Sequence, residues 1–201
     1  MSEAVHKDYI GAKFGMWLFL FTEILLFGGL FVLYAVYLNR YPEGFIAGGG
    51  ELDVRFGAAN TLVLLTSSLF VAMSITALRR GEKRLCSLLL VGTILSALIF
   101  LINKYFEWSS KISHGIYPGS EHLLEIPKGE AVFFNLYYVM TGLHGLHVLI
   151  GMIVLAFTLV FVIRDKVTGE DWVLLENAGL YWHLVDVIWI FLFPLFYLLL
   201  H

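Results

Sequence analysis

Cysteine and charge are both scarce in this sequence. The chain of 201 residues holds one cysteine, Cys86, which excludes a disulfide framework within it and a CxxC-type zinc or iron–sulfur site. Only 14% of the residues are charged, against roughly a quarter in an ordinary soluble domain. The formal net charge is −3, so the sequence lacks the basic surface with which proteins bind nucleic acid.

Apolar side chains dominate instead, at 59% of the residues. A stretch of about 20 apolar residues crosses a hydrocarbon core of about 30 Å as a helix. We count five such stretches, at residues 14–38, 58–78, 85–108, 131–163 and 178–200. Since backbone groups in lipid need a helix or a closed barrel, the sequence predicts an all-α integral membrane protein. We expect a single membrane domain over residues 1–201, a bundle of five transmembrane helices.

The basic residues predict the orientation of this bundle. Short cytoplasmic connections are enriched in Lys and Arg, and the second connection carries Arg79, Arg80, Lys83 and Arg84. Counting spans from there, we expect the N-terminus in the cytoplasm and the C-terminus outside.

Small residues recur four apart in the second span, at Ser68, Ala72 and Thr76. Such spacing lets membrane helices approach closely, although small residues are also common in membrane helices for no such reason. We expect helix packing at this stripe.

Glu23 lies ten residues past Lys13, about 15 Å along a helix and therefore close to the bilayer centre. A carboxylate facing lipid there costs at least about 2.5 kcal/mol, so Glu23 must be protonated or have a partner. Two interpretations stay open. Glu23 is either a hydrogen-bonded acid that helps helices pack, or a group that exchanges protons or contacts a partner.

Two further pairs of ionisable residues lie at similar depth. His144 and His147 are three residues apart in the fourth span, and His183 and Asp186 are three apart in the fifth. Since a buried polar group needs a partner, we expect Glu23 and these four residues to form one polar cluster between helices.

A metal centre is the competing interpretation of these residues. Carboxylate-bridged bundles use ExxH on two helices, and ExxH is absent here. Haem ligation between His147 and His183 is compatible with the spacing. The sequence nevertheless predicts no metal.

Two more residues stand out at span ends: Glu107, which we expect to meet water or Lys104, and Arg164, suited to an anionic lipid head group or simply extended to the interface.

Four segments together resemble one family. TGLHGLHVLIG at 141–151 and GLYWHLVDVIWIFLF at 179–193 look like signatures of cytochrome c oxidase subunit III, as do FTEILLFGGLF at 21–31 and YFEWSSKISHGIY at 105–117. The resemblance covers essentially the whole chain. It begins at the family's third helix, which implies the five-helix bacterial form, in the plasma (inner) membrane.

The resemblance implies a non-catalytic subunit of a haem–copper oxidase, supporting dioxygen reduction and proton pumping in the respiratory chain. Haems and copper would lie in partner subunits I and II, and none in this chain. Glu23 matches the family's carbodiimide-reactive glutamate, and Arg164 stands near its lipid-binding arginine. Members stabilise subunit I and its proton-uptake side and bind phospholipid. A small subunit IV or a larger supercomplex would be further partners.

Other functions remain open. Five-helix relatives also include quinol oxidase subunits and a nitric oxide reductase accessory protein, although Glu23, rather than Asp, favours the cytochrome c branch. A remote alternative is an independent membrane enzyme whose metal is held by His144, His147, His183 and Asp186.

Overall fold

The computed structural model of this protein describes residues 8–199. Seven helices make up this part of the chain: α1 (Tyr9–Arg40), α2 (Pro42–Gly50), α3 (Val54–Arg79), α4 (Lys83–Ser113), α5 (Glu121–Glu125), α6 (Lys128–Ile163) and α7 (Val173–Tyr197). Five of them, α1, α3, α4, α6 and α7, are long and apolar enough to cross a membrane. This confirms the predicted all-α protein with five spans, while the orientation of its termini stays a prediction.

Two of the long helices, α1 and α3, begin at polar capping residues that precede their apolar stretches. The Asp8 side chain accepts a hydrogen bond from the Gly11 amide at 2.8 Å, and Asp53 accepts one from Arg55 at 2.8 Å. These side chains satisfy amides that have no partner inside the helix. Helices α1 and α3 therefore begin before residues 14 and 58, where the apolar stretches start. The last helix begins at Val173 and ends at Tyr197, against the predicted 178–200.

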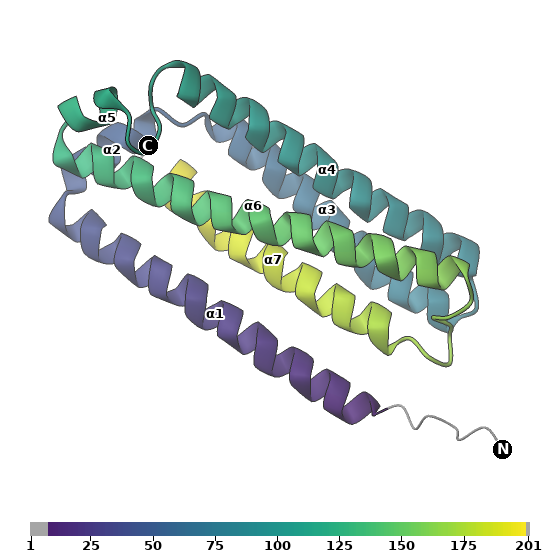
Figure 1. The fold of residues 1–201 in the computed structure, drawn as a ribbon. Helices are drawn as coiled ribbons and strands as arrows, with labels where there is room; N and C mark the ends of the chain where they lie inside the picture. The colour runs from purple at the N-terminus through teal and green to yellow at the C-terminus, as the bar shows by residue number, and fades with distance from the viewer. Residues whose placement is uncertain (1–7, 200–201) are drawn as a thin grey trace.

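Helices α3, α4, α6 and α7 pack together, and α1 lies along one side of them against α6 and α7 (Figure 1). The apolar stretch of α1 is 11% buried, whereas those of the other four spans are 33 to 50% buried. Most of the α1 surface therefore faces outward, toward lipid or another subunit.

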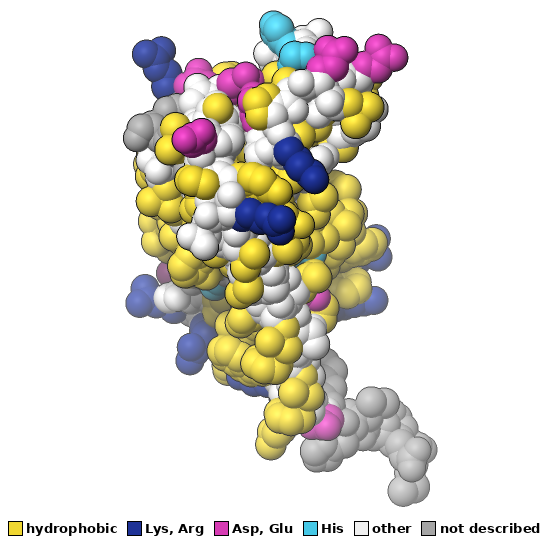
Figure 2. All heavy atoms as spheres, turned by 90° about the vertical axis from the view of Figure 1, so that its left-hand side faces the viewer, with side chains coloured by type: hydrophobic (Ala, Val, Ile, Leu, Met, Phe, Trp, Pro, Cys, Tyr) yellow, Lys and Arg dark blue, Asp and Glu magenta, His cyan; other side chains and the backbone are white. Residues whose placement is uncertain are grey.

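The short helices α2 and α5 were not predicted, since they lie in connections too short and polar to span a membrane. They cover one end of the bundle, called here the cap end, and α2 packs on the start of α6 (Figure 1). A Cβ atom on Gly44 would lie 2.6 Å from the backbone of Gly129 and Glu130, so this close contact requires glycine. Figure 2 looks onto this end, where acidic side chains and histidines gather along the top of the view.

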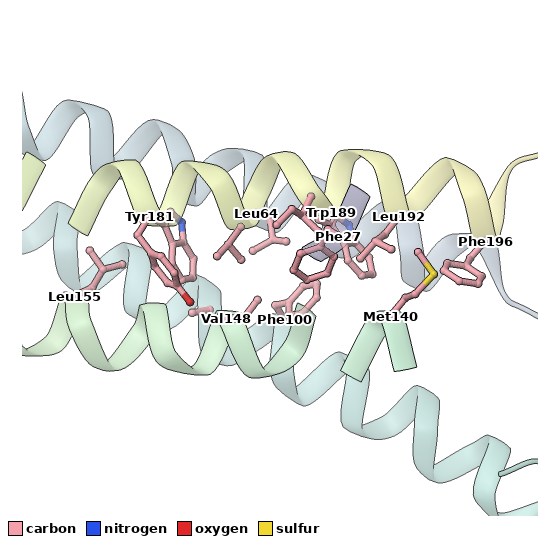
Figure 3. Packing of buried hydrophobic residues seen from close by; sticks show 14 of the residues in the cluster. Phe27, Leu64, Phe100, Met140, Val148, Leu155, Tyr181, Trp189, Leu192 and Phe196 are labelled. Carbon is pink, nitrogen blue, oxygen red and sulfur yellow. The ribbon is translucent and has the colours of Figure 1, made fainter. Parts of the chain in front are cut away.

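The core between the long helices combines aliphatic and aromatic side chains (Figure 3), and most of its largest fully buried side chains are aromatic. The Phe100 ring of α4 meets Trp189 of α7 edge-on, with ring centroids 4.8 Å apart, and Phe27 of α1 is 1% exposed. Edge-to-face packing of this kind adds to the energy of burial. It leaves little space between the helices, so polar groups placed there must fit among fixed rings.

Candidate functional site: buried polar groups between the helices

Glu23 of α1 and His147 of α6 form a hydrogen-bonded pair. Glu23 Oε2 lies 2.9 Å from His147 Nε2, and the two side chains are 14% and 9% exposed. The other ring nitrogen, Nδ1, lies 2.8 Å from the Leu143 carbonyl oxygen. Phe27 packs edge-on against the His147 ring, and the Tyr181 hydroxyl donates to the His147 carbonyl. The pair therefore joins α1 to α6 within an aromatic surround.

These contacts define how a proton can be shared. Because a carbonyl oxygen only accepts, His147 Nδ1 must carry a hydrogen and donate it to Leu143. Nε2 then either accepts a proton from a neutral Glu23 or donates one to a charged Glu23. Both forms hold one proton between Oε2 and Nε2, so the pair can keep a neutral total without losing its hydrogen bond.

His183 and Asp186 lie on α7 and have different surroundings from this pair. His183 Nδ1 is 2.6 Å from the Ser68 hydroxyl of α3. The Asp186 side chain is 3% exposed, and the Ser68 side chain lies beside its carboxyl group, although no well-formed hydrogen bond joins the two. The partner of His183 is therefore a serine that the sequence analysis had assigned to packing.

His144 is completely buried and packs against two aromatic rings. It is 0% exposed, and neither ring nitrogen has a hydrogen-bond partner in the described chain. Its ring centroid lies 5.4 Å from that of Phe100 and 5.2 Å from that of Trp189. Of the five residues expected to form one cluster, the structure joins Glu23 to His147 by a hydrogen bond, places His183 and Asp186 beside the same serine, Ser68, and leaves His144 among aromatic rings.

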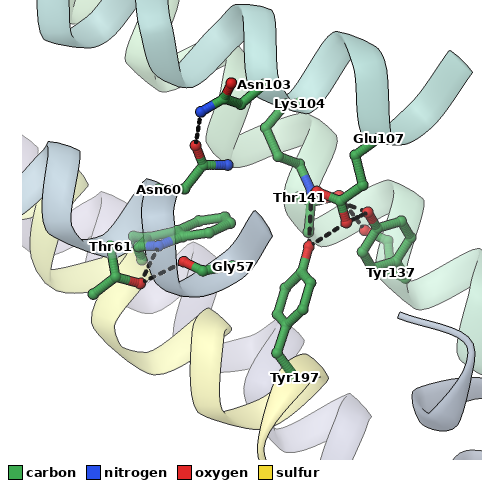
Figure 4. A network of polar contacts seen from close by, with 10 residues as sticks. Gly57, Asn60, Thr61, Asn103, Lys104, Glu107, Tyr137, Thr141 and Tyr197 are labelled. Carbon is green, nitrogen blue, oxygen red and sulfur yellow. Dashed lines mark hydrogen bonds and ion pairs between the residues drawn. The ribbon is translucent and has the colours of Figure 1, made fainter. Parts of the chain in front are cut away.

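A second polar network, near the cap end, surrounds Lys104 and Glu107 of α4 (Figure 4). Lys104 Nζ lies 3.0 Å from Glu107 Oε2 and 3.0 Å from the hydroxyls of both Tyr137 and Tyr197. Each tyrosine hydroxyl also donates to Glu107 Oε1. Lys104 and Glu107 are 7% and 6% exposed, so this network, the Lys104 network, is a buried ion pair held by two tyrosines.

The sequence indicated only part of the Lys104 network. Lys104 and Glu107 are three residues apart, which places them on one helix face, and their contact was one of the two expected. Their burial was not, since Glu107 was expected at a membrane border. Tyr137 of α6 and Tyr197 of α7 were not singled out, because no local pattern connects them with α4.

Arg164 closes α6 as its exposed C-terminal cap residue. The next residue, Asp165, has a positive φ of 55° and forms an ion pair with Lys83 at 2.6 Å. That pair ties the end of α6 to the start of α4. The Arg164 amide donates to the Val160 carbonyl oxygen at 3.0 Å, while its side chain makes no hydrogen bond or ion pair with the described residues.

No group of three or more His, Cys, Asp or Glu side chains in residues 8–199 is arranged to hold a metal ion. In particular, His147 bonds to Glu23, His144 lies among aromatic rings, and His183 and Asp186 lie beside Ser68. The ligand set considered for an independent metal enzyme is therefore not assembled in this chain.

Comparison of the sequence with known proteins identifies the family of this chain. The family model described as cytochrome c oxidase subunit III matches residues 2–200. The chain belongs to the cytochrome c oxidase subunit III family. It is therefore a subunit III of the haem–copper oxidases, a multi-pass protein of the bacterial membrane and part of an oxidase complex with other subunits.

Three relatives show the range of this family. Cytochrome c oxidase subunit 3 of Thermostichus vulcanus is 32% identical over 96% of this chain and 89% of its own length. Cytochrome bo(3) ubiquinol oxidase subunit 3 of Pseudomonas putida is 29% identical over 92% of this chain and 84% of its own. The haem–copper oxidase subunit I+III of Aeropyrum pernix is 30% identical over 96% of this chain, which spans only 23% of that protein.

Proposed function

We propose that this chain is the non-catalytic subunit III of a cytochrome c oxidase. It supports dioxygen reduction and proton pumping by stabilising subunit I on its proton-uptake side and by binding phospholipid. Haems and copper reside in subunits I and II, and the chain itself carries no redox centre. The observation that carries the proposal is the relative from Aeropyrum pernix, whose name combines subunits I and III in one protein.

The surface of the bundle supports such a role. Helix α1 contacts only part of α6, α7 and α2, and bulky apolar residues such as Phe14, Trp17 and Phe21 are more than half exposed. A helix so weakly packed against its own chain gains from a further surface in the membrane. The Glu23–His147 pair then links α1 to the bundle from the inside.

Purification of the tagged chain from its native membrane tests this proposal. We expect haem-containing subunit I and subunit II to copurify, and the complex to oxidise reduced cytochrome c. Removal of this chain should leave haem absorbance with subunit I but lower the stability or turnover of the complex. Isolation of the chain without a haem–copper partner would refute the proposal.

A quinol oxidase is the second candidate, because the relative from Pseudomonas putida carries that name at nearly the same identity. The same preparation separates the two candidates. A complex without subunit II copper that oxidises ubiquinol and not cytochrome c would establish the quinol branch. Glu23 in place of Asp is the feature that favours cytochrome c.

A further inference from the structure

The turn between α3 and α4 carries two adjoining hollows on the outer surface of the bundle. The first is a groove between the two helices of about 290 Å³, with apolar walls formed by Ala72, Met73, Leu85 and Leu89. The second, of about 280 Å³, is lined by Thr76, Arg79 and Arg80. Thr76 and Arg80 line both hollows, so an apolar groove leads directly to a site with two guanidinium groups.

The groove exists because small side chains face outward. Ala72 and Thr76 belong to the stripe of small residues expected at a helix contact. Ser68 of this stripe contacts His183 of α7, whereas Ala72 and Thr76 are exposed within this chain. A phenylalanine fills the space further along, where a Cβ atom on Gly92 would lie 3.1 Å from the Phe70 ring.

The polar hollow has an excess of positive charge. Arg79 stacks on the Trp172 ring, with its guanidinium carbon 4.9 Å from the ring centroid, and this contact holds it in place. Neither Arg79 nor Arg80 forms an ion pair with an acidic side chain in residues 8–199. Glu82 lines the apolar groove and is exposed. It is the one acidic group lining these hollows, against two arginines.

We propose that the α3–α4 groove binds one anionic phospholipid, with its phosphate at Arg79 and Arg80 and one acyl chain along Ala72 and Leu89. Arginine presents several N–H donors that match a phosphate group. Basic pockets between membrane helices suit anionic head groups. A groove of about 290 Å³ is at the small end for a ligand pocket, so it accommodates part of one acyl chain and leaves the rest of the lipid in the bilayer.

This inference rests on the lipid-binding part of the proposed function and locates the lipid in the groove between α3 and α4. It differs from the site suggested by the resemblance, because Arg164 lines neither hollow. The residues that bind the head group come from the end of α3 instead. The lipid would bridge α3 and α4 where they join.

Native mass spectrometry of the full-length chain, with whatever subunits copurify, tests the site. Delipidated protein is titrated with phosphatidylglycerol or with phosphatidylcholine of the same chain length. We expect tighter binding of phosphatidylglycerol. Arg80→Gln and Arg79→Gln should each weaken it about fivefold, the effect of one arginine near a phosphate. Arg84→Gln removes the same charge from the first turn of α4, and Arg84 lines neither hollow, so this variant should change binding less than twofold.

A second pair of variants tests the acyl part. Ala72→Leu fills the groove and should weaken binding of both lipids, whereas Ala59→Leu, the same change on an exposed position of α3, should not. Equal binding of the two lipids by the unmodified chain would overturn the proposal. So would equal losses in Arg84→Gln and Arg80→Gln, or full binding in Ala72→Leu. Because the assay does not depend on which subunits copurify, a failed lipid site is distinguishable from a failed subunit assignment.

Discussion

Glu23 and His147 meet across the α1–α6 contact, with 2.9 Å between Oε2 and Nε2. Helix α1 packs less closely than any other span, with 11% of its apolar stretch buried. The Glu23–His147 hydrogen bond is one of several polar contacts of α1, together with the Tyr34 hydroxyl on the Leu195 carbonyl oxygen at 2.7 Å and the Lys13–Glu176 ion pair at 2.7 Å. The geometry of the Glu23–His147 pair allows the shared proton to be bound by either residue. A structural role and a proton-exchanging role of Glu23 therefore predict different effects of substitutions at this position.

Glu23→Gln keeps a donor for His147 Nε2, because the amide nitrogen can donate where a neutral carboxyl would. We expect normal complex yield and partial oxidase activity in this variant. Glu23→Leu leaves Nε2 buried without a partner, at a cost of about 1–3 kcal/mol, and should lower the thermal midpoint of the complex. Complete loss of dioxygen uptake in Glu23→Gln, at normal yield, would show instead that Glu23 must exchange protons.

The Lys104 network predicts that the stability of the complex depends strongly on the ion pair between Lys104 and Glu107. Lys104→Met leaves the Glu107 carboxylate buried without its cation, which costs about 3–5 kcal/mol. Lys104→Met combined with Glu107→Gln removes both charges and should recover much of that loss. Denaturant titration of the purified complex measures the difference between the single and double variants.

Lys111 provides the matched control for this experiment. It donates to the Glu51 carbonyl oxygen and pairs with the Glu51 carboxylate at 3.4 Å, where the Lys111 and Glu51 side chains are 17% and 43% exposed, against 8% and 5% for Lys104 and Glu107. Surface pairs of this kind contribute at most about 1 kcal/mol, so Lys111→Met should have little effect. A double variant no more stable than Lys104→Met alone would mean that the two tyrosines, and not the ion pair, determine stability.

Depth in the membrane could be predicted from the sequence, since each helical residue rises about 1.5 Å. That calculation placed Glu23 and His147 at one level, and they do meet. It could not predict which neighbour each helix face meets. His144 and His147 are three residues apart, yet His147 turns to α1 and His144 to the rings of Phe100 and Trp189. Rotation of a helix about its axis is decided by packing with all its neighbours.

The Lys104 network could not be predicted in full for a similar reason, because its members on different helices are far apart in the sequence. Its tyrosines lie 33 and 93 residues from Lys104 in the sequence. Only the assembled bundle brings them together, because three different helices contribute. The short helices α2 and α5 escaped prediction for another reason: they are held by contacts at the cap end and have no apolar stretch of their own.

The surroundings of Asp186 in the structure change the effect expected of substituting it. Had it bonded to the histidines, Asp186→Leu would have left them unpaired. In the structure its carboxyl group lies beside the Ser68 side chain, whereas His147 bonds to Glu23 of α1. Because Ser68 keeps its contact with His183 at 2.6 Å, leucine at this position leaves no partner unpaired. We expect Asp186→Leu and Asp186→Asn to give the normal yield of complex, measured by haem content after purification. Loss of the complex in Asp186→Leu, with Asp186→Asn unaffected, would mean that a polar group at this position is needed.

Gly44 is expected to control the cap end separately from the rest of the bundle. An added Cβ atom would lie 2.6 Å from backbone atoms of α6, and backbone cannot move aside as a flexible side chain can. Gly44→Ala should therefore displace α2 at a cost of about 1–3 kcal/mol and raise hydrogen exchange in residues 42–50, while α3 and α4 exchange as before. Gly50→Ala is the matched control, because nothing lies within 4 Å of its added Cβ atom. Faster exchange throughout the chain in Gly44→Ala would show that α2 stabilises the whole bundle, and unchanged exchange would show that α6 can yield to the added methyl group.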